Sequence, residues 1–341
     1  MAVTEDILDL LESAEGPVSG EEMAEKLGIS RNSVWKAVGK LKEAGYEIEA
    51  GTNRGYRLIS SHNVLTPQGV RRLLSGSAKG CAIDVRDSVT STNTVLKAIA
   101  EQGGAEGMIL IAHQQTQGKG RLGRTFLSPK GTGLYISILL RPKFSAEESL
   151  CITTAAAVAV AEAIDEATGQ HAMIKWVNDV YLRGRKVCGI LTEASVDFEN
   201  SGLNYAIVGI GVNIQEPPGG FAPEMRDVAG ALYQGEVPPG VRTKLAAEIV
   251  NRFFGFYTDL TQRPFMKSYR ERSLLTGLEV TFAQGESIQE GLVLGVDDEA
   301  RYDGKKNVYE LDESAPHMVR DNNKCILCRR CVGVCENIQG I

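Results

Sequence analysis

The densest group of residues that could do chemistry is a seven-residue stretch, Gly118–Arg124, which reads GKGRLGR. Its three glycines let backbone N–H groups approach a ligand closely, and Lys119, Arg121 and Arg124 supply positive charge. This composition predicts a loop that holds a phosphate or a carboxylate. The first six residues also fit G-x-G-x-x-G, the pattern of dinucleotide-binding sites.

The sequence on either side of this glycine loop excludes two folds that use such loops. The stretch GMILIAHQQ (107–115) predicts a strand before the loop, and TFLSPKGTGLYISILLRP (125–142) predicts a strand after it. A dinucleotide site needs a helix whose N-terminus receives the pyrophosphate, and no helix is expected here. A kinase needs an H-R-D loop and a D-F-G motif, and neither follows. We therefore expect a loop between two strands that is mobile until an anion binds.

Three further motifs surround the glycine loop in the sequence. STN (91–93) is expected to begin a helix and to offer small polar side chains to a compact polar group. KWVND (175–179) is expected at the end of an apolar strand, and RKVCGILTE (185–193) places Lys186 just before the next strand. Each motif is weak alone, because STN could be a plain helix cap and Trp176 a core residue. Their order is more specific than any single motif.

The first sixty residues have the pattern of three helices and a hairpin. Apolar residues from Ile7 to Leu11 have helical spacing, and a second helix is expected from Glu21 to Leu27, ending at Gly28. Ser30 is a suitable N-cap for a third helix that runs to about Ala44. Val34, Val38 and Leu41 are expected on its inner face, flanked by Trp35 and Ala37. The stretch YEIEAGTNRGYRL (46–58) then predicts a hairpin.

The charge pattern of this segment favours DNA binding. Residues 1–25 hold eight acidic residues and no Lys or Arg, whereas residues 31–42 hold four basic residues and no acid. Two helices joined by a short turn match a helix-turn-helix, in which the second helix presents its N-terminal residues to base edges. We expect DNA contacts from that helix and from the hairpin, made by Arg31, Asn32, Ser33, Lys36 and Arg54. The alternative is a solvated helix face.

The whole chain has the composition of a multidomain globular protein. Its 341 residues predict two or three domains, and 43% hydrophobic with 23% charged residues is typical of such proteins. The net charge of −6 argues against general nucleic-acid binding. No apolar run is long enough to span a membrane, and the acidic start is unlike a signal peptide, so we expect a cytoplasmic protein. Cys81, Cys151 and Cys188 are expected to be buried apolar residues.

The motifs together identify a family resemblance. STN, QTQGKGRLGR, SPKGTGLYIS, KWVND, KVCGIL and VGIGVN occur in the order and spacing of the biotin protein ligases. With the N-terminal winged helix, residues 6–300 resemble the bifunctional ligases that also repress the biotin operon. The lipoate ligases are the nearest alternative. The resemblance implies an α+β multidomain chain. A winged helix-turn-helix precedes a mixed sheet with helices, like that of class II aminoacyl-tRNA synthetases, and a partial SH3-like β domain follows.

The resemblance also implies a reaction and a role for each motif. ATP, Mg²⁺ and biotin would give biotinyl-5′-AMP, and a lysine of a biotin carboxyl carrier protein would then receive the biotinyl group. Biotin would be held by Ser91, Thr92, Asn93, Gln115, Lys119, Gly120, Arg121 and Lys186. ATP would be held by Gly118, Arg121, Arg124, Trp176, Asn178 and Asn213. Catalytic roles fall to Arg121, Lys186 and Asp179, the last either orienting the incoming lysine or binding metal.

Two positions depart from the family pattern. Lys119 stands where arginine is common, so the charge remains but the bidentate fork is lost, and we expect weaker retention of the adenylate. Val177 replaces a proline, which we expect to change only stiffness. An alternative function is a biotin-sensing DNA-binding regulator that has lost catalysis. Operator DNA, a carrier protein and a second copy of the chain are the expected partners, with no membrane.

The C-terminal residues carry a different signal. Residues 273–300 resemble the start of the family's SH3-like domain, whereas residues 301–341 resemble a ferredoxin-like segment of iron-only hydrogenases. Cys325, Cys328, Cys331 and Cys335 have the C-x2-C-x2-C-x3-C spacing of a [4Fe–4S] site. Three interpretations remain open: a fusion of two truncated reading frames, a bare cluster-binding or zinc-binding tail, and a redox-sensing ligase. The expected domains are therefore 1–60, 65–272, 273–300 and 301–341.

Overall fold

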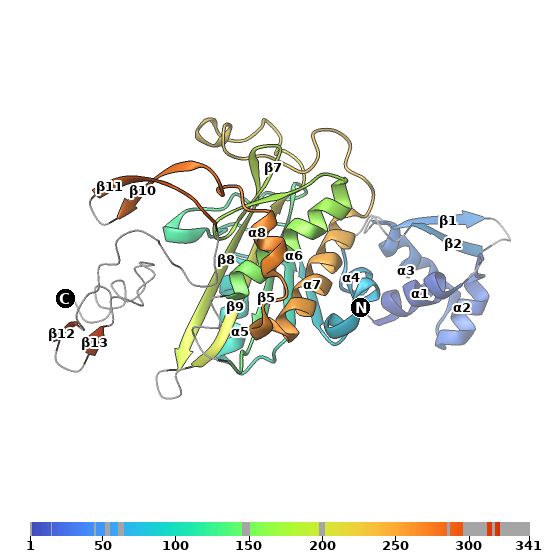
Figure 1. The fold of residues 1–341 in the computed structure, drawn as a ribbon. Coiled ribbons are helices and arrows are strands. Elements are labelled where there is room, and N and C mark those ends of the chain that lie inside the picture. Colours follow the sequence, from blue (N-terminus) through green and yellow to red (C-terminus); the bar gives the residue numbers. More distant parts are fainter. Residues whose placement is uncertain are drawn as a thin grey trace. The chain divides into compact units, whose positions relative to one another are not determined.

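The computed structural model divides the chain into two compact units, one ending at Leu275 and one beginning at Thr276. Figure 1 shows both in sequence colours. The structure describes residues 2–14, 16–43, 46–51, 55–60, 65–144, 151–197, 202–284, 287–295, 312–315 and 318–320. The predicted DNA contact Arg54 and the four cysteines from Cys325 to Cys335 lie outside the described residues.

The N-terminal segment folds as the predicted three helices and hairpin. Its elements are α1 (Ala2–Ser13), α2 (Gly20–Leu27), α3 (Arg31–Glu43), β1 (Glu47–Gly51) and β2 (Gly55–Ser60). Helix α2 ends at Gly28, which adopts the left-handed conformation, φ +64°. The Ser30 hydroxyl accepts a hydrogen bond from Ser33 N at 3.1 Å, as expected of an N-cap. Strands β1 and β2 pair antiparallel and form the wing.

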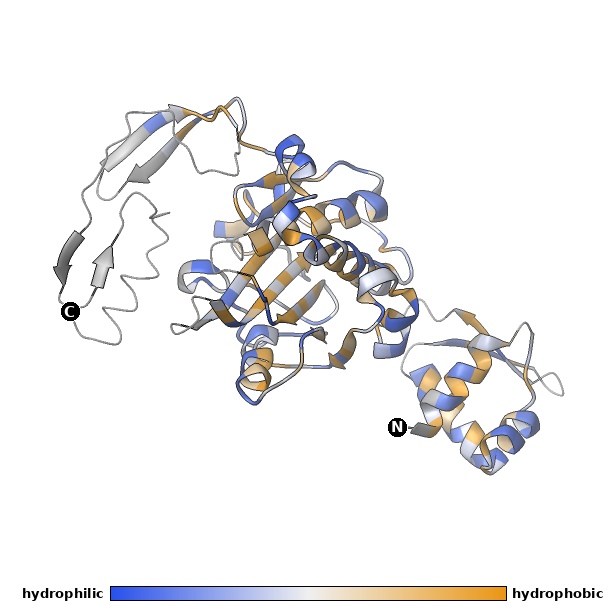
Figure 2. Ribbon diagram, turned by 60° about the horizontal axis from the view of Figure 1, so that its bottom comes forward, coloured by the Kyte–Doolittle hydropathy of each residue, from blue (hydrophilic) through white to orange (hydrophobic). Residues whose placement is uncertain are grey.

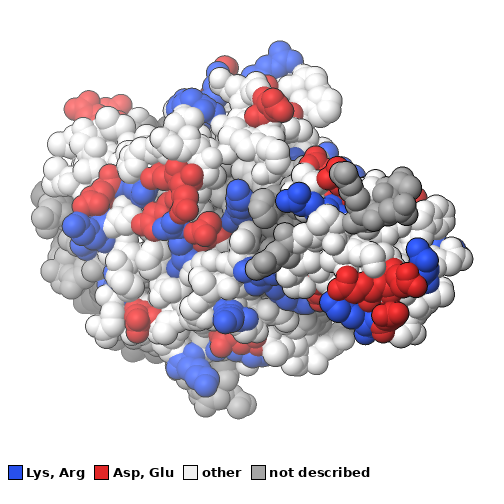
Figure 3. All heavy atoms as spheres, turned by 90° about the vertical axis from the view of Figure 1, so that its right-hand side faces the viewer, with Lys and Arg blue, Asp and Glu red and all other residues white. Residues whose placement is uncertain are grey.

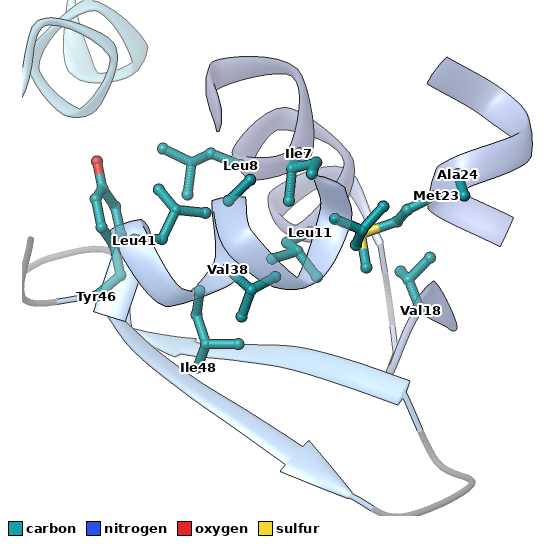
Figure 4. Packing of buried hydrophobic residues seen from close by; sticks show 12 residues of the cluster. Ile7, Leu8, Leu11, Val18, Met23, Ala24, Val38, Leu41, Tyr46 and Ile48 are labelled. Atoms are coloured by element: carbon teal, nitrogen blue, oxygen red, sulfur yellow. The ribbon is translucent and has the colours of Figure 1, made fainter. Parts of the chain in front are cut away.

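A small apolar core holds this segment together. Figure 4 shows side chains of α1, α2 and α3 converging above the wing strand that carries Ile48. The predicted inner residues of α3 are buried, and of the two residues expected to flank them Ala37 is buried whereas Trp35 is 64% exposed. The core is filled from the Val34–Val38–Leu41 side of the helix.

The core of the first unit is a seven-stranded mixed sheet, as predicted. The strand order is β3-β4-β5-β9-β8-β7-β6, in which β3 and β4 are parallel and every other neighbouring pair is antiparallel. The bounds are β3 (Ala82–Arg86), β4 (Met108–Ala112), β5 (Gly133–Leu140), β6 (Met173–Lys175), β7 (Asp179–Leu182), β8 (Arg185–Asp197) and β9 (Gly202–Asn213). Lys186 therefore lies inside β8, not just before it.

Helices cover the sheet and complete the core. They are α4 (Pro67–Leu73), α5 (Thr92–Glu101), α6 (Cys151–Thr168), α7 (Val241–Thr258) and α8 (Met266–Glu271). Helix α5 packs on β4, β5 and β9, whereas α6 packs on β6 to β9 and against α7. Figure 2 shows hydrophobic residues concentrated on the central strands and on parts of the helices. No helix among the described residues is long and apolar enough to cross a membrane.

Two smaller features bear on the earlier expectations. Cys81 and Cys188 are buried, as expected, and Cys151 is half-buried. The second unit contains the antiparallel hairpin β10 (Glu279–Gln284) and β11 (Ser287–Leu292), followed by β12 (Asp312–Ala315) and β13 (Met318–Arg320). Its likeness to an SH3-like domain stays a prediction.

The last residues of the first unit add a short backbone pairing to the sheet edge. Ile174 N of β6 donates to Arg272 O at 2.7 Å, and Leu274 N donates to Ile174 O at 2.8 Å. Ser273 thereby forms a parallel bridge with Ile174. The edge strand that leads into the KWVND turn is thus covered on its outer side.

Candidate active site

A pocket of about 410 Å³ lies over strands β8 and β9 and is bounded by the glycine loop. It gathers the predicted motifs from far apart in the sequence. Among the predicted binding and catalytic residues, those that line it are Ser91, Thr92, Asn93, Gln115, Lys119, Gly120, Arg121, Arg124, Trp176, Asn178, Asp179, Lys186 and Asn213. Gly118 is the predicted residue that does not line it. The remaining lining residues include Gly209 and Gly211, which belong to the GIGVN strand expected beside the nucleotide, and Phe126 and Val228, which were not predicted.

The glycine loop closes on itself as a short hairpin without a following α-helix. Gly120 N donates to Arg124 O at 2.7 Å, and Phe126 N donates to Gly118 O at 2.9 Å. A Cβ atom on Gly118 would lie 2.2 Å from Phe126 O, so this position must be glycine for the loop to close. Gly118 therefore shapes the base of the loop.

The floor of the pocket is made of glycines on two neighbouring strands. Gly209 and Gly211 of β9 alternate with apolar residues and so face the same side of the sheet. A Cβ on Gly209 would lie 2.2 Å from Asn93 Oδ1, and one on Gly211 would lie 2.5 Å from the Phe126 ring. The alternation in VGIGVN is the sequence signal that could have identified this floor.

One end of the pocket is neutral and polar. Gln115 Oε1 accepts hydrogen bonds from Thr92 N at 2.9 Å and from the Thr92 hydroxyl at 3.1 Å. Gln115 Nε2 donates to the Ser128 hydroxyl at 2.8 Å. Asn93 Nδ2 donates to Glu193 Oε2 at 2.7 Å. The STN motif is thus held at the start of α5 by side chains from three other segments.

The other end of the pocket is charged. Arg121 Nη1 donates to Asn178 Oδ1 at 2.8 Å, and Asn178 Nδ2 donates to Ile190 O at 2.8 Å. Lys186 Nζ lies 2.7 Å from Asp179 Oδ1. This contact is an ion pair without hydrogen-bond geometry, because among the described residues no donor is directed at that buried oxygen. The Arg121–Asn178 hydrogen bond and the Lys186–Asp179 ion pair would both have to open or adjust for an anion to bind.

Strand register sets the separation between the two ends. Leu191 of β8 pairs with Gly209, beside Asn93, and Gly189 pairs with Gly211. Lys186 Nζ lies 3.4 Å from the Cβ position of Gly189. The polar end lies beside Gly209 of β9, and the lysine lies beside Gly189 of β8. These positions are two residues apart along the strands and one strand apart across the sheet, a separation on the order of 10 Å. The pocket can therefore bind an elongated ligand with a neutral polar head and an anionic end.

The rim beside the charged end is apolar. Trp176 is 61% exposed, and Met225 and Val228 are 43% and 49% exposed. All three line the pocket. The peptide bond between Trp176 and Val177 is cis. An exposed indole next to cations offers a flat surface on which an aromatic base can stack, so Trp176 is not the core residue considered as its alternative.

The charge of the lining favours anions over metal ions. The lining contains a single carboxylate, that of Asp179, and four cationic side chains, those of Lys119, Arg121, Arg124 and Lys186. Among the described residues no group of three or more His, Cys, Asp or Glu could hold a metal ion. Mg²⁺ is commonly bound by one or two carboxylates together with substrate phosphates. Asp179 fits such a shared site.

The predicted DNA-reading residues lie at the start of α3. Arg31, Asn32 and Lys36 are exposed, and Ser33 is half-buried beside Ser30. Arg31 Nη1 lies 3.8 Å from Glu21, a solvated ion pair. Figure 3 shows Lys and Arg interspersed with Asp and Glu on the face it presents. Arg31 and Lys36 are the exposed cations that the N-terminal turns of α3 would offer to DNA.

Comparisons with known proteins match both the N-terminal helices and the pocket. Residues 85–213 match the Biotin/lipoate A/B protein ligase family, and residues 3–57 match an HTH domain. Bifunctional ligase/repressor BirA of Bacillus subtilis (strain 168) is 32% identical over 316 residues, which cover 90% of this chain and 97% of that protein. BirA of Escherichia coli (strain K12) is 29% identical over 197 residues, 58% of this chain and 59% of that protein.

A solved structure has the same core. Biotin protein ligase from Aquifex aeolicus, in complex with biotin and ATP, superimposes with a TM-score of 0.51 at 31% identity. The match covers 63% of this chain and 88% of that chain.

Proposed function

This chain belongs to the family of bifunctional biotin ligases and repressors, and from this premise we propose how its own residues perform the two activities. It is a biotin protein ligase with a helix-turn-helix repressor domain. The observation that best supports the residue assignment is the pocket itself. A neutral polar end and a cationic end lie on one glycine floor.

Biotin has a neutral ureido ring at one end and a carboxylate at the other. We place the ureido ring beside Ser91, Thr92 and Asn93, with Gln115 holding Thr92 in position. Its carboxylate then extends toward Arg121 and Lys186. The separation of the two pocket ends, on the order of 10 Å, suits a bicyclic head with a short acyl chain.

ATP enters from the cationic end. Trp176 and the apolar rim receive the adenine, and Asn178 and Asn213 supply polar contacts. Lys119, Arg121 and Arg124 hold the phosphates, with Gly120 allowing close approach of the backbone. Asp179 would hold a phosphate-bound Mg²⁺, which neutralises phosphate charge when present.

The first step joins the biotin carboxylate to the nucleotide. A carboxylate oxygen attacks the α-phosphorus of ATP, the bond to the bridging oxygen breaks, and pyrophosphate leaves with that electron pair. Negative charge accumulates on phosphate oxygens, which Arg121 and Lys186 would stabilise. Lys186 first leaves its ion pair with Asp179.

The second step transfers the biotinyl group. The amine of a carrier-protein lysine attacks the carbonyl carbon of the mixed anhydride, and AMP leaves. The Asp179 carboxylate, released from Lys186, can orient that amine, whose proton passes to the departing AMP phosphate or to water as the amide bond forms. Carrier docking would involve the second unit, whose β10–β11 hairpin follows the ligase core.

Intact-mass measurement of a carrier domain incubated with the chain, biotin and MgATP tests the assignment. We expect one biotinyl group per carrier for the wild type and none for Lys186→Ala, which also loses pyrophosphate release. Lys79→Ala removes an exposed lysine outside the pocket and should transfer normally. Normal transfer by Lys186→Ala would refute the assignment.

We further propose that α3 contacts operator DNA through Arg31, Asn32, Ser33 and Lys36, and that two copies of the chain bind together. Exposed cations at the N-terminal turns of a helix in a helix-turn-helix support this placement. Gel-shift titration with operator DNA should show weaker binding for Lys36→Ala, and analytical ultracentrifugation of the complex should give two chains per operator. One chain per operator would refute the dimer.

The tail cysteines Cys325, Cys328, Cys331 and Cys335 keep their cluster assignment as a proposal from spacing alone. Iron, acid-labile sulfide and zinc contents of anaerobically purified protein decide among the interpretations. Four iron atoms per chain would support the cluster, and one zinc per chain would support a zinc site. If neither metal is found, the interpretation as a fusion of two truncated reading frames is favoured.

A further inference from the structure

A continuous chain of polar side chains runs behind the neutral end of the pocket. It passes from Glu193 of β8 through Asn93 of α5 and Ser137 of β5 to Thr92. Ser137 is completely buried, and Asn93 and Thr92 are 3% and 4% exposed. Thr92 and Asn93 line the pocket, whereas Glu193 and Ser137 do not. Glu193 and Ser137 could therefore act on a ligand only through Asn93 and Thr92.

Glu193 fixes the orientation of the Asn93 amide. A carboxylate and a carbonyl oxygen only accept hydrogen bonds. Asn93 Nδ2 lies 2.7 Å from Glu193 Oε2 and 3.3 Å from Leu191 O, so the amide nitrogen must face these two acceptors. The amide oxygen, Oδ1, then faces Ser137 at 2.6 Å. Because Oδ1 has no proton, the Ser137 hydroxyl must donate to it.

Because the Ser137 hydroxyl donates its proton to Asn93, it also determines what Thr92 can do. A hydroxyl group has one proton, and Ser137 Oγ also lies 2.7 Å from Thr92 Oγ1. Once the Ser137 proton is directed to Asn93, the Thr92 proton serves either Ser137 or Gln115 Oε1, which lies 3.1 Å away. In both cases the Thr92 proton is used inside the protein. The Thr92 hydroxyl therefore offers the pocket only a lone pair.

We propose that Glu193 and Ser137 are positioning residues that make Thr92 a hydrogen-bond acceptor, so that the pocket selects a ligand carrying an N–H group at this end. The inference rests on the proposed ligase function, in which that ligand is the biotin ureido ring. A ureido ring carries two N–H groups, and an analogue lacking the matched N–H leaves a buried lone pair unpaired. Sites built this way discriminate strongly against such analogues.

Titration calorimetry with biotin and with its two mono-N-methylated ureido derivatives tests the proposal on the full chain. For the wild type we expect one derivative to bind at least about 100-fold more weakly than biotin. Glu193→Ala and Ser137→Ala should weaken biotin binding about tenfold and shrink that discrimination at least about tenfold. Glu193→Gln, whose amide oxygen can still accept from Asn93, should restore most of both quantities.

Two controls separate positioning from general damage. Ser195→Ala removes a hydroxyl from the same strand, outside this hydrogen-bond chain, and should behave as the wild type. The KM for ATP should stay within about twofold in all variants, because the affected contacts serve only the neutral end.

Each other outcome overturns the proposal. Unchanged biotin affinity in Glu193→Ala and Ser137→Ala would show that the order of donors does not matter. Equal weakening for biotin and both derivatives, or no rescue by Glu193→Gln, would show a merely structural role. Failure of the wild type to bind biotin at all would overturn the proposed function together with this inference, and is distinguishable from the other results.

Discussion

Lysine at position 119 gives the glycine loop a point charge where an arginine would offer a planar fork. A guanidinium can bind two oxygens of a phosphate or carboxylate at once, so Lys119→Arg should hold the adenylate longer. We expect its release rate to fall about three- to tenfold. Stopped-flow displacement by excess biotin and ATP measures this rate.

Lys130→Arg is the matched control for that substitution. Lys130 pairs with Asp87 outside the pocket, so the same chemical change there should leave adenylate release unaltered. Equal release rates for Lys119→Arg and the wild type would mean that residue 119 does not touch the adenylate.

His113, between β4 and the glycine loop, should make stability sensitive to acid. Burial lowers the pKa of His113, and the charges of Lys130 and Arg242 lower it further, against the opposing effect of Asp87. The folded state thus binds this proton less readily than the unfolded chain, whose histidine pKa is about 6.5. Stability from this residue is constant above that pH and falls as the pH drops below it.

Melting temperatures at pH 7.5 and pH 5.5 check this effect. His113→Gln should show a smaller decrease between the two pH values than the wild type, because its side chain does not titrate. The same decrease in both proteins would assign the acid sensitivity to other groups.

Strand β9 is the element whose sequence most directly creates the pocket. Gly211→Ala would place a methyl group 2.5 Å from the Phe126 ring, and the ring would have to move into the binding space. We expect biotin affinity to fall at least about tenfold with little change in melting temperature. Gly235→Ala, where a Cβ meets nothing within 4 Å, is the control. Wild-type affinity in Gly211→Ala would contradict the assignment of the floor.

The elements themselves were largely predictable, because their signals are local. The Ser30 cap, the Gly28 stop and the alternation in the hairpin depend on neighbours within a few residues. Motif order also predicted most of the pocket lining. The Gly209–Asn93 approach and the Ser137–Asn93 hydrogen bond were not predictable in this way. They join residues far apart in the sequence, and they become apparent only when strand order and register are known.

Two further differences have equally physical reasons. Trp35 was expected to flank the inner face of its helix as Ala37 does, but it is largely exposed, because the helix core is filled by smaller side chains. Lys186 was expected just before a strand. In the structure β8 continues through it, since Lys186 pairs with Tyr181 of β7, and its backbone also bonds to residues 228 and 230.

At the scale of the molecule, the two activities rest on separate groups of residues and should be separable. Gly55 begins the second wing strand with φ +81°, and a Cβ there would lie 2.3 Å from Val18 O. Gly55→Ala should therefore disrupt the wing and weaken operator binding at least about tenfold, while biotin transfer stays normal. Gel-shift titration and intact-mass transfer assays measure the two activities. Gly16→Ala, which meets nothing within 4 Å, should affect neither. Loss of both activities in Gly55→Ala would show that they depend on one another.

The pairing of Ile174 with residues 272–274 also has a mechanical consequence. Because these two backbone hydrogen bonds lie just before Thr276, tension applied at Thr276 would load the edge of the sheet at Ile174. Ile174 is two residues from Trp176, so that load would reach the rim of the pocket along β6. We therefore expect the rate of biotin transfer to depend on the force applied through a tether attached at the C-terminus.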